Sequence, residues 1–202
     1  MVMVLEDARA ALRRLGGNRL HPRYTHGASE LMMASVKLHH AVTDQDFADV
    51  HALATAELGP DLASLAEIKR VDRLTDAAIW VVRRNETVTG FLAPLALTAE
   101  GVAALTDGAF DAANIDQKWV ARMGEPLAGF YCWCYAGKDQ VSRGALVLAL
   151  RTLIDKHFPD LPFFGKDTTE AGAKIMRHLG FFPFDGVDHL YWRCRTVMDD
   201  AA

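Results

Sequence analysis

Residues 127–157 read LAGFYCWCYAGKDQVSRGALVLALRTLIDKH, and this stretch decides the fold of the chain. Its first part, Leu127 to Tyr135, is rich in aromatic and apolar residues and predicts a β-strand. Its last part predicts a helix from Gly144 to His157, because leucines recur there at helical spacing. A strand that leads directly into a helix is typical of a crossover in a sheet that helices cover.

Upstream of this stretch the sequence predicts one strand and two helices. The strand is expected over 36–42. Thr43 and Asp46 have the spacing of a capping box, which predicts a helix that begins here and ends near Leu58, before Gly59-Pro60. A second amphipathic helix is expected over 61–74.

A hairpin is expected next. Residues 77–82 and 88–97 favour strands, and the polar run 83–86 favours the turn between them. Pro94 inside the second strand indicates an edge, a bulge or a bend, since proline cannot donate to the ladder. The poorly periodic stretch at about 98–120 is interpreted as an insertion with a short helix over 99–105.

The C-terminal third predicts further alternation of strand and helix. A short strand is expected over 161–164, and Thr168 or Thr169 is expected to cap a helix that ends at Leu179-Gly180. Two closing strands are expected over 181–183 and 189–195. Hairpins mix with helical crossovers, so we expect an α/β (α+β) fold, a central mixed sheet flanked by helices. Residues 1–35 are interpreted as an N-terminal helix with an irregular extension, and 36–202 as one domain.

Composition excludes several classes of protein. The 202 residues carry a formal net charge of −4, and 50% of them are apolar. The net charge therefore predicts no nucleic acid partner. The longest uncharged apolar runs are about ten residues, too short to span a bilayer, so we expect no membrane either. Three cysteines in a chain of this size predict a reduced, cytoplasmic protein rather than a disulfide framework. No metal site is expected, and the histidines, His189 among them, are interpreted as structural. A homodimer stays open.

The junction of strand and helix is the candidate site. A helix that starts near Gly144 presents free N–H groups to an anion, and Arg143 adds a charged donor. Strict alternation would place Cys132 and Cys134 on one face of the strand, and Tyr131, Trp133 and Tyr135 on the other. Buried thiols are the favoured interpretation of the cysteines, and a nucleophilic Cys134 is the alternative.

The order of elements from 36 to 195 resembles the GNAT acyltransferase superfamily. Three segments carry the resemblance: the capped helix start at 40–46, the hairpin that enters its second strand at Gly90-Phe91, and the helix that runs from Thr169 into Leu179-Gly180-Phe181. The resemblance implies an enzyme that transfers an acetyl or other acyl group from acyl-CoA to a small-molecule or peptide amine. The amine would attack the thioester directly in a ternary complex.

The same resemblance implies where acetyl-CoA or another acyl-CoA binds. The strand end, formed by Cys132, Trp133, Cys134 and Tyr135, would hold the pantetheine arm. The helix start would hold the pyrophosphate, through Gln140, Val141, Ser142, Arg143, Gly144 and Ala145. This loop departs from the superfamily's pattern: Val141 stands where Arg or Gln is usual, and the loop is about three residues shorter.

The catalytic positions depart from the family pattern as well. Met176 stands where many members have the tyrosine that protonates the departing thiolate, and a thioether cannot donate a proton. Tyr135 and Ser142 are therefore the candidate catalytic residues, as alternative donors. Two other functions stay open: a catalytically degenerate GNAT-like binding protein, and an acyltransferase that takes its acyl group from an acyl carrier protein (acyl-ACP).

Overall fold

The computed structural model describes residues 37–76 and 78–194, and the helix expected near the N-terminus lies outside them. Its strands form one sheet in the order β1-β2-β3-β4-β5-β7-β6. The strands are β1 (Lys37–His40), β2 (Trp80–Arg84), β3 (Thr87–Leu97), β4 (Gly129–Gly137), β5 (Phe163–Lys166), β6 (Phe182–Pro183) and β7 (Leu190–Arg193). Of the described neighbouring pairs, only β4 and β5 are parallel. The sheet is therefore mixed, as the sequence predicts.

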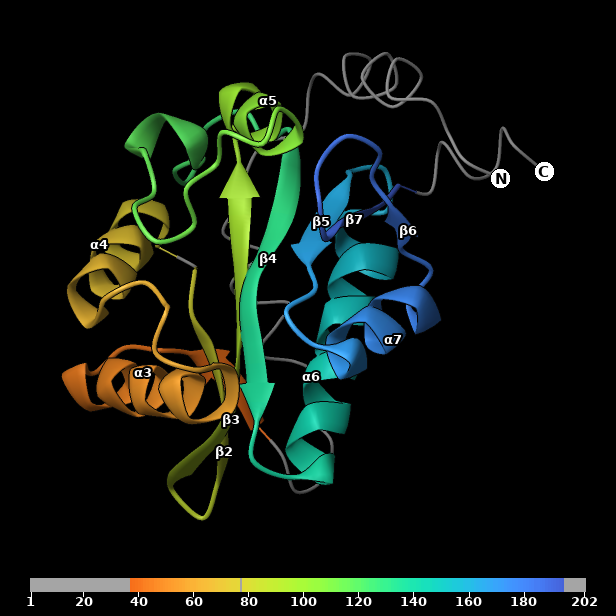
Figure 1. Ribbon diagram of the computed structural model, residues 1–202. Helices are drawn as coiled ribbons and strands as arrows, with labels where there is room; N and C mark the ends of the chain where they lie inside the picture. The colour runs from red at the N-terminus through yellow and green to blue at the C-terminus, as the bar shows by residue number, and fades with distance from the viewer. Residues whose placement is uncertain (1–36, 77, 195–202) are drawn as a thin grey trace.

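Helices cover both faces of this sheet (Figure 1). The helical elements are α3 (Asp44–Leu58), α4 (Leu65–Thr75), α5 (Ala99–Thr106), the 3₁₀ turn η1 (Gln117–Trp119), α6 (Gln140–Thr152), the π-helical turn η2 (Leu153–His157) and α7 (Glu170–His178). One hydrophobic core lies between the sheet and α3, α4 and α5. A second core lies between the opposite face of the sheet and α6, η2 and α7. We call these the α3/α4 face and the α6/α7 face.

The start of α3 has the capping box that the sequence predicts. The Asp46 N–H donates to Thr43 Oγ1 at 3.1 Å, and the Thr43 N–H donates to Asp46 Oδ2 at 3.1 Å. The helix ends at Leu58, with Gly59 at φ 95° in the left-handed region that glycine tolerates. Both ends of α3 are therefore set by local chemistry.

Two helices begin elsewhere than predicted. The second helix starts at Leu65 rather than residue 61, because the Ser64 hydroxyl caps it by accepting from the Glu67 N–H. The helix predicted from Gly144 starts four residues earlier, at Gln140, because Asp139 is its N-cap. Residues expected to form a loop therefore lie in the first turn of α6.

Candidate active site

Strands β4 and β5 run side by side for only part of the length of β4. Their register ends with Cys132 opposite Gly165, and β5 stops one residue later at Lys166. β4 continues to Gly137 and stays paired with β3 on its other side. From Trp133 onward, β4 therefore has no strand partner on its β5 side within the described residues. Backbone N–H and C=O groups on such an edge are available to an extended ligand.

A β-bulge lies at the point where this free edge begins. Ala93 on β3 faces Cys134, whereas the next residue, Pro94, faces Cys132, so Trp133 is the extra residue. The bulge that Pro94 predicted is thus present. An extra residue leaves its backbone groups out of the regular ladder and aims them away from it.

The bulge overturns the predicted distribution of side chains on β4. Tyr131, Trp133 and Cys134 pack on the α3/α4 face, whereas Cys132 and Tyr135 pack on the α6/α7 face. The two cysteines are on opposite faces, and Tyr135 is separated from the other two aromatic residues. The prediction assumed strict alternation, which one inserted residue reverses for everything that follows it.

Burial makes both thiols on β4 poor nucleophiles. It raises the pKa of Cys132 and of Cys134 to about 12. Thiolate, not thiol, is the reactive form, so very little of it is present near neutral pH. This favours the structural interpretation of both cysteines over a nucleophilic Cys134.

We expect neither thiol to react with iodoacetamide at pH 8 while the protein is folded. In 8 M urea both are expected to react within minutes, because unfolding restores the ordinary thiol pKa. Mass spectrometry of the modified peptides separates Cys132 from Cys134. Selective modification of Cys134 in the folded protein would contradict the structural interpretation.

Tyr135 lies on the free part of β4 and is half-buried on the α6/α7 face. Its hydroxyl makes no hydrogen bond to another residue of the described ranges. Burial raises its pKa above the usual 10.0, and the neighbouring Arg143 only partly offsets this. The hydroxyl therefore keeps its proton at neutral pH and has a free hydrogen-bonding capacity.

Met176, on α7, covers Gly165, the last residue of β5 that pairs with β4. A Cβ added at Gly165 would overlap Met176 Cε and come within 3.0 Å of its Sδ. Glycine at 165 thus makes room for the thioether, beside Cys132. Where the resemblance would place a tyrosine hydroxyl, this chain places an apolar side chain without a proton to donate.

The start of α6, the predicted pyrophosphate site, already holds a carboxylate. The Ser142 N–H donates to Asp139 Oδ1 at 2.8 Å, and Arg84 pairs with Asp139 Oδ2 at 2.8 Å. The backbone hydrogen bond from Ser142, helped by the charge of Arg84, lowers the pKa of Asp139. Asp139 is therefore ionised and occupies a position where an anion would bind.

The other predicted residues at this helix start differ in their accessibility. Ser142 is fully buried, and its Oγ donates to Thr89 Oγ1 at 2.8 Å. Arg143 Nε donates to the Gly137 carbonyl at 2.9 Å, which fixes its side chain over the end of β4. Gly144 faces open space. Gln140 and Val141 are exposed, and Ala145 is half-buried. Their role in binding acyl-CoA stays a prediction.

The insertion is attached to the body of the fold through α4 and β4. Glu67 accepts from the Ile115 N–H at 2.8 Å, and Arg70 bonds both Glu67 and the Ile115 carbonyl. Trp133 Nε1 donates to the Ala112 carbonyl at 2.8 Å. Glu67 is therefore occupied in holding the insertion. The insertion covers the bulge residue from the α3/α4 face.

We expect Glu67→Gln to loosen the insertion without unfolding the domain. The pKa of Glu67 is lowered in the folded protein, chiefly by the hydrogen bond from Arg70. The carboxylate therefore stabilises the attachment of the insertion fully above the pKa of the unfolded state. This stabilisation is lost as the pH falls through the pKa of the folded state. Limited proteolysis between 107 and 118 is expected to become several-fold faster in the variant at pH 7. In the wild type the same acceleration is expected only in acid, at a pH below the ordinary glutamate pKa of 4.5. Equal cleavage rates at pH 7 would show that the carboxylate does not hold the segment.

Residues 37–76 and 78–194 contain no group of three or more His, Cys, Asp or Glu side chains placed to hold a metal ion. In the same residues, no helix is long and apolar enough to cross a bilayer.

Known proteins resemble this chain in structure rather than in sequence. No protein-family model matches it, and no curated protein does either. A GNAT-family acetyltransferase from Streptococcus agalactiae 2603 is 19% identical with a TM-score of 0.51, over 82% of this chain and 98% of that one. One from Bacillus cereus ATCC 10987 is 12% identical with a TM-score of 0.49, over 79% and 97%. AtaTR bound with AcCoA is 15% identical with a TM-score of 0.44, over 84% and 99%.

The assignment of the fold depends on the Streptococcus agalactiae structure. Together with the mixed sheet and its covering helices, it shows that this chain has the fold of the GNAT acetyltransferases. The fold class that the sequence predicts is confirmed.

Proposed function

We propose that this protein transfers an acyl group from acyl-CoA to an amine. One observation carries the proposal: the parallel strands β4 and β5 separate after Cys132, and the free edge of β4 begins at a bulge. A fold by itself does not define a function, whereas this edge offers a specific binding chemistry. The amide groups of a pantetheine arm have the donors and acceptors that such an edge requires.

In this proposal the thioester lies beside the bulge. The backbone N–H groups near Trp133 polarise its carbonyl, because they are preorganised and lie outside the regular ladder. The amine attacks the carbonyl carbon, the C–N bond forms, and the C–S bond breaks. Proximity of the two substrates in one complex supplies much of the rate.

Of the two candidate donors for the departing thiolate, Tyr135 is the better supported. Its hydroxyl is protonated at neutral pH, half-buried and unbonded among the described residues. Ser142 is fully buried and bonded to Thr89, so no substrate reaches its hydroxyl in this conformation. We therefore assign Tyr135 the role of donor.

Asp139 favours a second candidate, a donor without a pyrophosphate at this point. An acyl-ACP presents the same thioester arm as acyl-CoA but carries no adenosine pyrophosphate. The free edge of β4 would bind the thioester arm of either donor. The Asp139 carboxylate at the start of α6 would repel only the pyrophosphate of acyl-CoA.

The variant Asp139→Asn separates the two donors. Asparagine caps helices as well as aspartate does, so the fold is preserved while the charge is removed. If pyrophosphate binds at this helix start, the Kd of acetyl-CoA is expected to fall about 5-fold, since a local charge at a helix N-terminus is worth about 1 kcal/mol. Isothermal titration calorimetry measures this. Acetyl-pantetheine, which lacks the pyrophosphate, is expected to bind the variant and the wild type equally.

Asp116→Asn is the matched control, because Asp116 is likewise an acidic N-cap but belongs to a different helical element, η1. An unchanged Kd for acetyl-CoA in Asp139→Asn would place the pyrophosphate elsewhere.

The proposed activity is tested in two steps. Acetyl-CoA and longer acyl-CoA thioesters are first expected to raise the Tm, because a ligand of the native state stabilises it. A thiol-release assay with a panel of amines then measures transfer, with acyl-ACP as the alternative donor. Stabilisation without any transfer would identify a binding protein, and neither stabilisation nor transfer would refute the proposal.

A further inference from the structure

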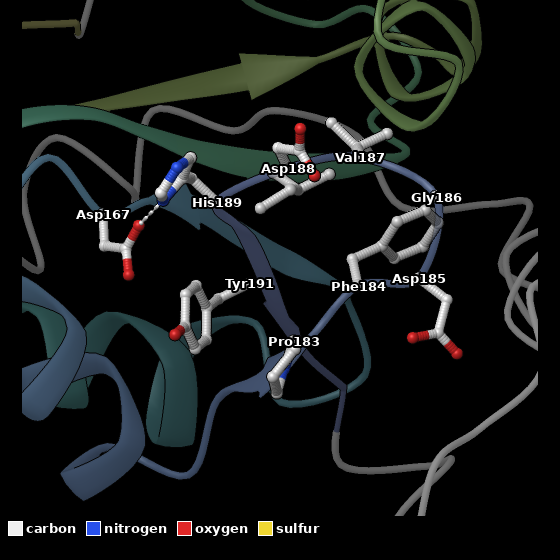
Figure 2. A pocket seen from close by; sticks show the side chains of 10 residues that line it. Asp167, Pro183, Phe184, Asp185, Gly186, Val187, Asp188, His189 and Tyr191 are labelled. Carbon is white, nitrogen blue, oxygen red and sulfur yellow. Dashed lines mark hydrogen bonds and ion pairs between the residues drawn. The ribbon is translucent and has the colours of Figure 1, made fainter.

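A pocket of about 330 Å³ lies between the end of β5 and the turn that joins β6 to β7 (Figure 2). Its volume is in the range of small-molecule sites. None of its ten lining residues, all in the described part of the chain, is Lys or Arg. The polar side chains that line it are Asp167, Asp185, Asp188 and His189, and the aromatic ones are Phe184 and Tyr191. Two exposed carboxylates, Asp185 and Asp188, beside aromatic walls suit a small cation.

The histidine at this pocket is oriented by one of the carboxylates. His189 Nδ1 lies 2.7 Å from Asp167 Oδ1, and Figure 2 shows the pair at one side of the pocket. An ionised carboxylate only accepts, so Nδ1–H is the donor, and in the neutral ring Nε2 carries the lone pair. The Asp167 N–H also donates to the His189 carbonyl at 3.1 Å, which ties the two residues through the backbone.

His189 combines an exposed ring with an unusual backbone. Its side chain is 73% exposed, whereas that of Asp167 is 14% exposed. Its φ of 60° is in the left-handed region, which a residue other than glycine seldom adopts. The fold thus holds a solvent-accessible imidazole against a nearly buried carboxylate, an arrangement typical of a general base.

The register of the sheet places this pair at the same end as the free edge of β4. Cys132 lies opposite Gly165, and Asp167 is two residues beyond Gly165 along the chain. Asp167 therefore stands at about the level of Cys134, where β4 has lost its β5 partner. The pair therefore lies at the end of the sheet at which the proposed function places the thioester.

We propose that this pocket binds the acceptor through a positively charged amino group and that His189 is the base that deprotonates it. The inference rests on the proposed function and adds the class of acceptor and a catalytic residue. His189 Nε2 takes one proton from the ammonium group and frees the lone pair that attacks the thioester. The C–N bond forms as the C–S bond breaks, Tyr135 protonates the departing thiolate, and the second proton lost from nitrogen replaces the one that Tyr135 gave up.

The roles within the pocket are distinct. Asp185 and Asp188 attract the cation and so contribute to the binding of the acceptor. Asp167 is a positioning residue, because it holds the His189 ring and tautomer rather than touching the acceptor.

The test compares His189→Asn with His178→Asn. Asparagine tolerates a positive φ, so the backbone at 189 is kept. His178 is an exposed histidine on α7 outside the pocket and serves as the matched control. With spermidine and a lysine-containing peptide as acceptors, His189→Asn is expected to lower kcat about 30-fold, and the control to stay within twofold. The Tm shift caused by acetyl-CoA is expected to be the same in all three proteins.

Two further measurements separate a base from a structural residue. In His189→Gly, which also suits the positive φ, added imidazole is expected to restore activity at least 5-fold, as an exposed base site allows. Asp185→Asn combined with Asp188→Asn is expected to raise KM for spermidine about 10-fold with kcat within twofold. Hydroxylamine, a neutral amine, is expected to show no such rise in KM.

The outcomes distinguish this inference from the proposed function. If acetyl-CoA stabilises the protein and amines are acylated, but the His189 and aspartate variants behave as the wild type, the pocket inference is overturned alone. If no thioester stabilises the protein and no amine is acylated, both are overturned.

Discussion

Replacing Tyr135 with phenylalanine is expected to lower kcat about 100-fold, with the KM for acyl-CoA changed by less than twofold. The hydroxyl lies at the free end of β4, keeps its proton at neutral pH and has no other hydrogen bond among the described residues. A positioned proton donor typically contributes 10²-fold or more to a rate. Steady-state kinetics with acetyl-CoA and a saturating amine measures the change.

The control for this variant is Tyr131→Phe. Tyr131 lies on the same strand but is buried on the α3/α4 face, against Phe110. Loss of the Tyr131 hydroxyl is expected to leave kcat within twofold of the wild-type value. Equal losses in the two variants would point to a general disturbance of β4, and an unchanged kcat in Tyr135→Phe would assign the proton to another donor, such as water.

The elements that could be predicted from the sequence are those whose ends depend on nearby residues. The capping box of Thr43 and Asp46, the glycine after Leu58 and the threonine that caps α7 are all local. Each of these residues satisfies backbone groups at an end of its own helix, so the helix end can be predicted from neighbouring residues alone. The mixed topology follows, because a hairpin and a helical crossover fix strand directions without knowledge of the core.

The features of the site that could not be predicted depend on residues far apart in the chain. The bulge at Trp133 is defined only by the register between β3 and β4, although Pro94 indicated that the ladder is interrupted. One extra residue reversed the faces of Cys134 and Tyr135. The attachment of the insertion to Glu67 is likewise a contact between segments 48 residues apart. Alternation and helical spacing carry no information about such pairs.

Two polar residues of the site differ in how far the sequence indicates them. Asp139 has a readable pattern, an aspartate directly before a helical run, although Gly144 favours a later helix start. His189 has none, since its partner Asp167 lies 22 residues away in the chain, directly after β5. Its interpretation as structural came from its isolation in the sequence, and only the pairing of β5 with β7 brings the two together.

Asp46→Ala is expected to cost about 3 kcal/mol of the free energy of unfolding and to lower the Tm by about 10 °C. The side chain is 1% exposed and accepts from the Val42 N–H at 3.0 Å and the Thr43 N–H at 3.1 Å. It also pairs with Arg83, whose Nε donates to His39 Nε2 at 2.9 Å. Alanine leaves two backbone donors and a largely buried guanidinium without their carboxylate. Urea denaturation and a thermal melt measure both quantities.

Asp44→Ala is the matched control for this loss. Asp44 is in the same first turn of α3 and has an ion pair of its own with Lys69, but its side chain is 92% exposed. Water screens such a pair, so its removal is expected to change the Tm far less. Since the cost at Asp46 comes from a cation left unpaired, Asp46→Ala combined with Arg83→Met is expected to recover part of it. A double variant less stable than Asp46→Ala would show instead that Arg83 stabilises the fold mainly through His39 and the Glu86 carbonyl, to which its guanidinium also donates.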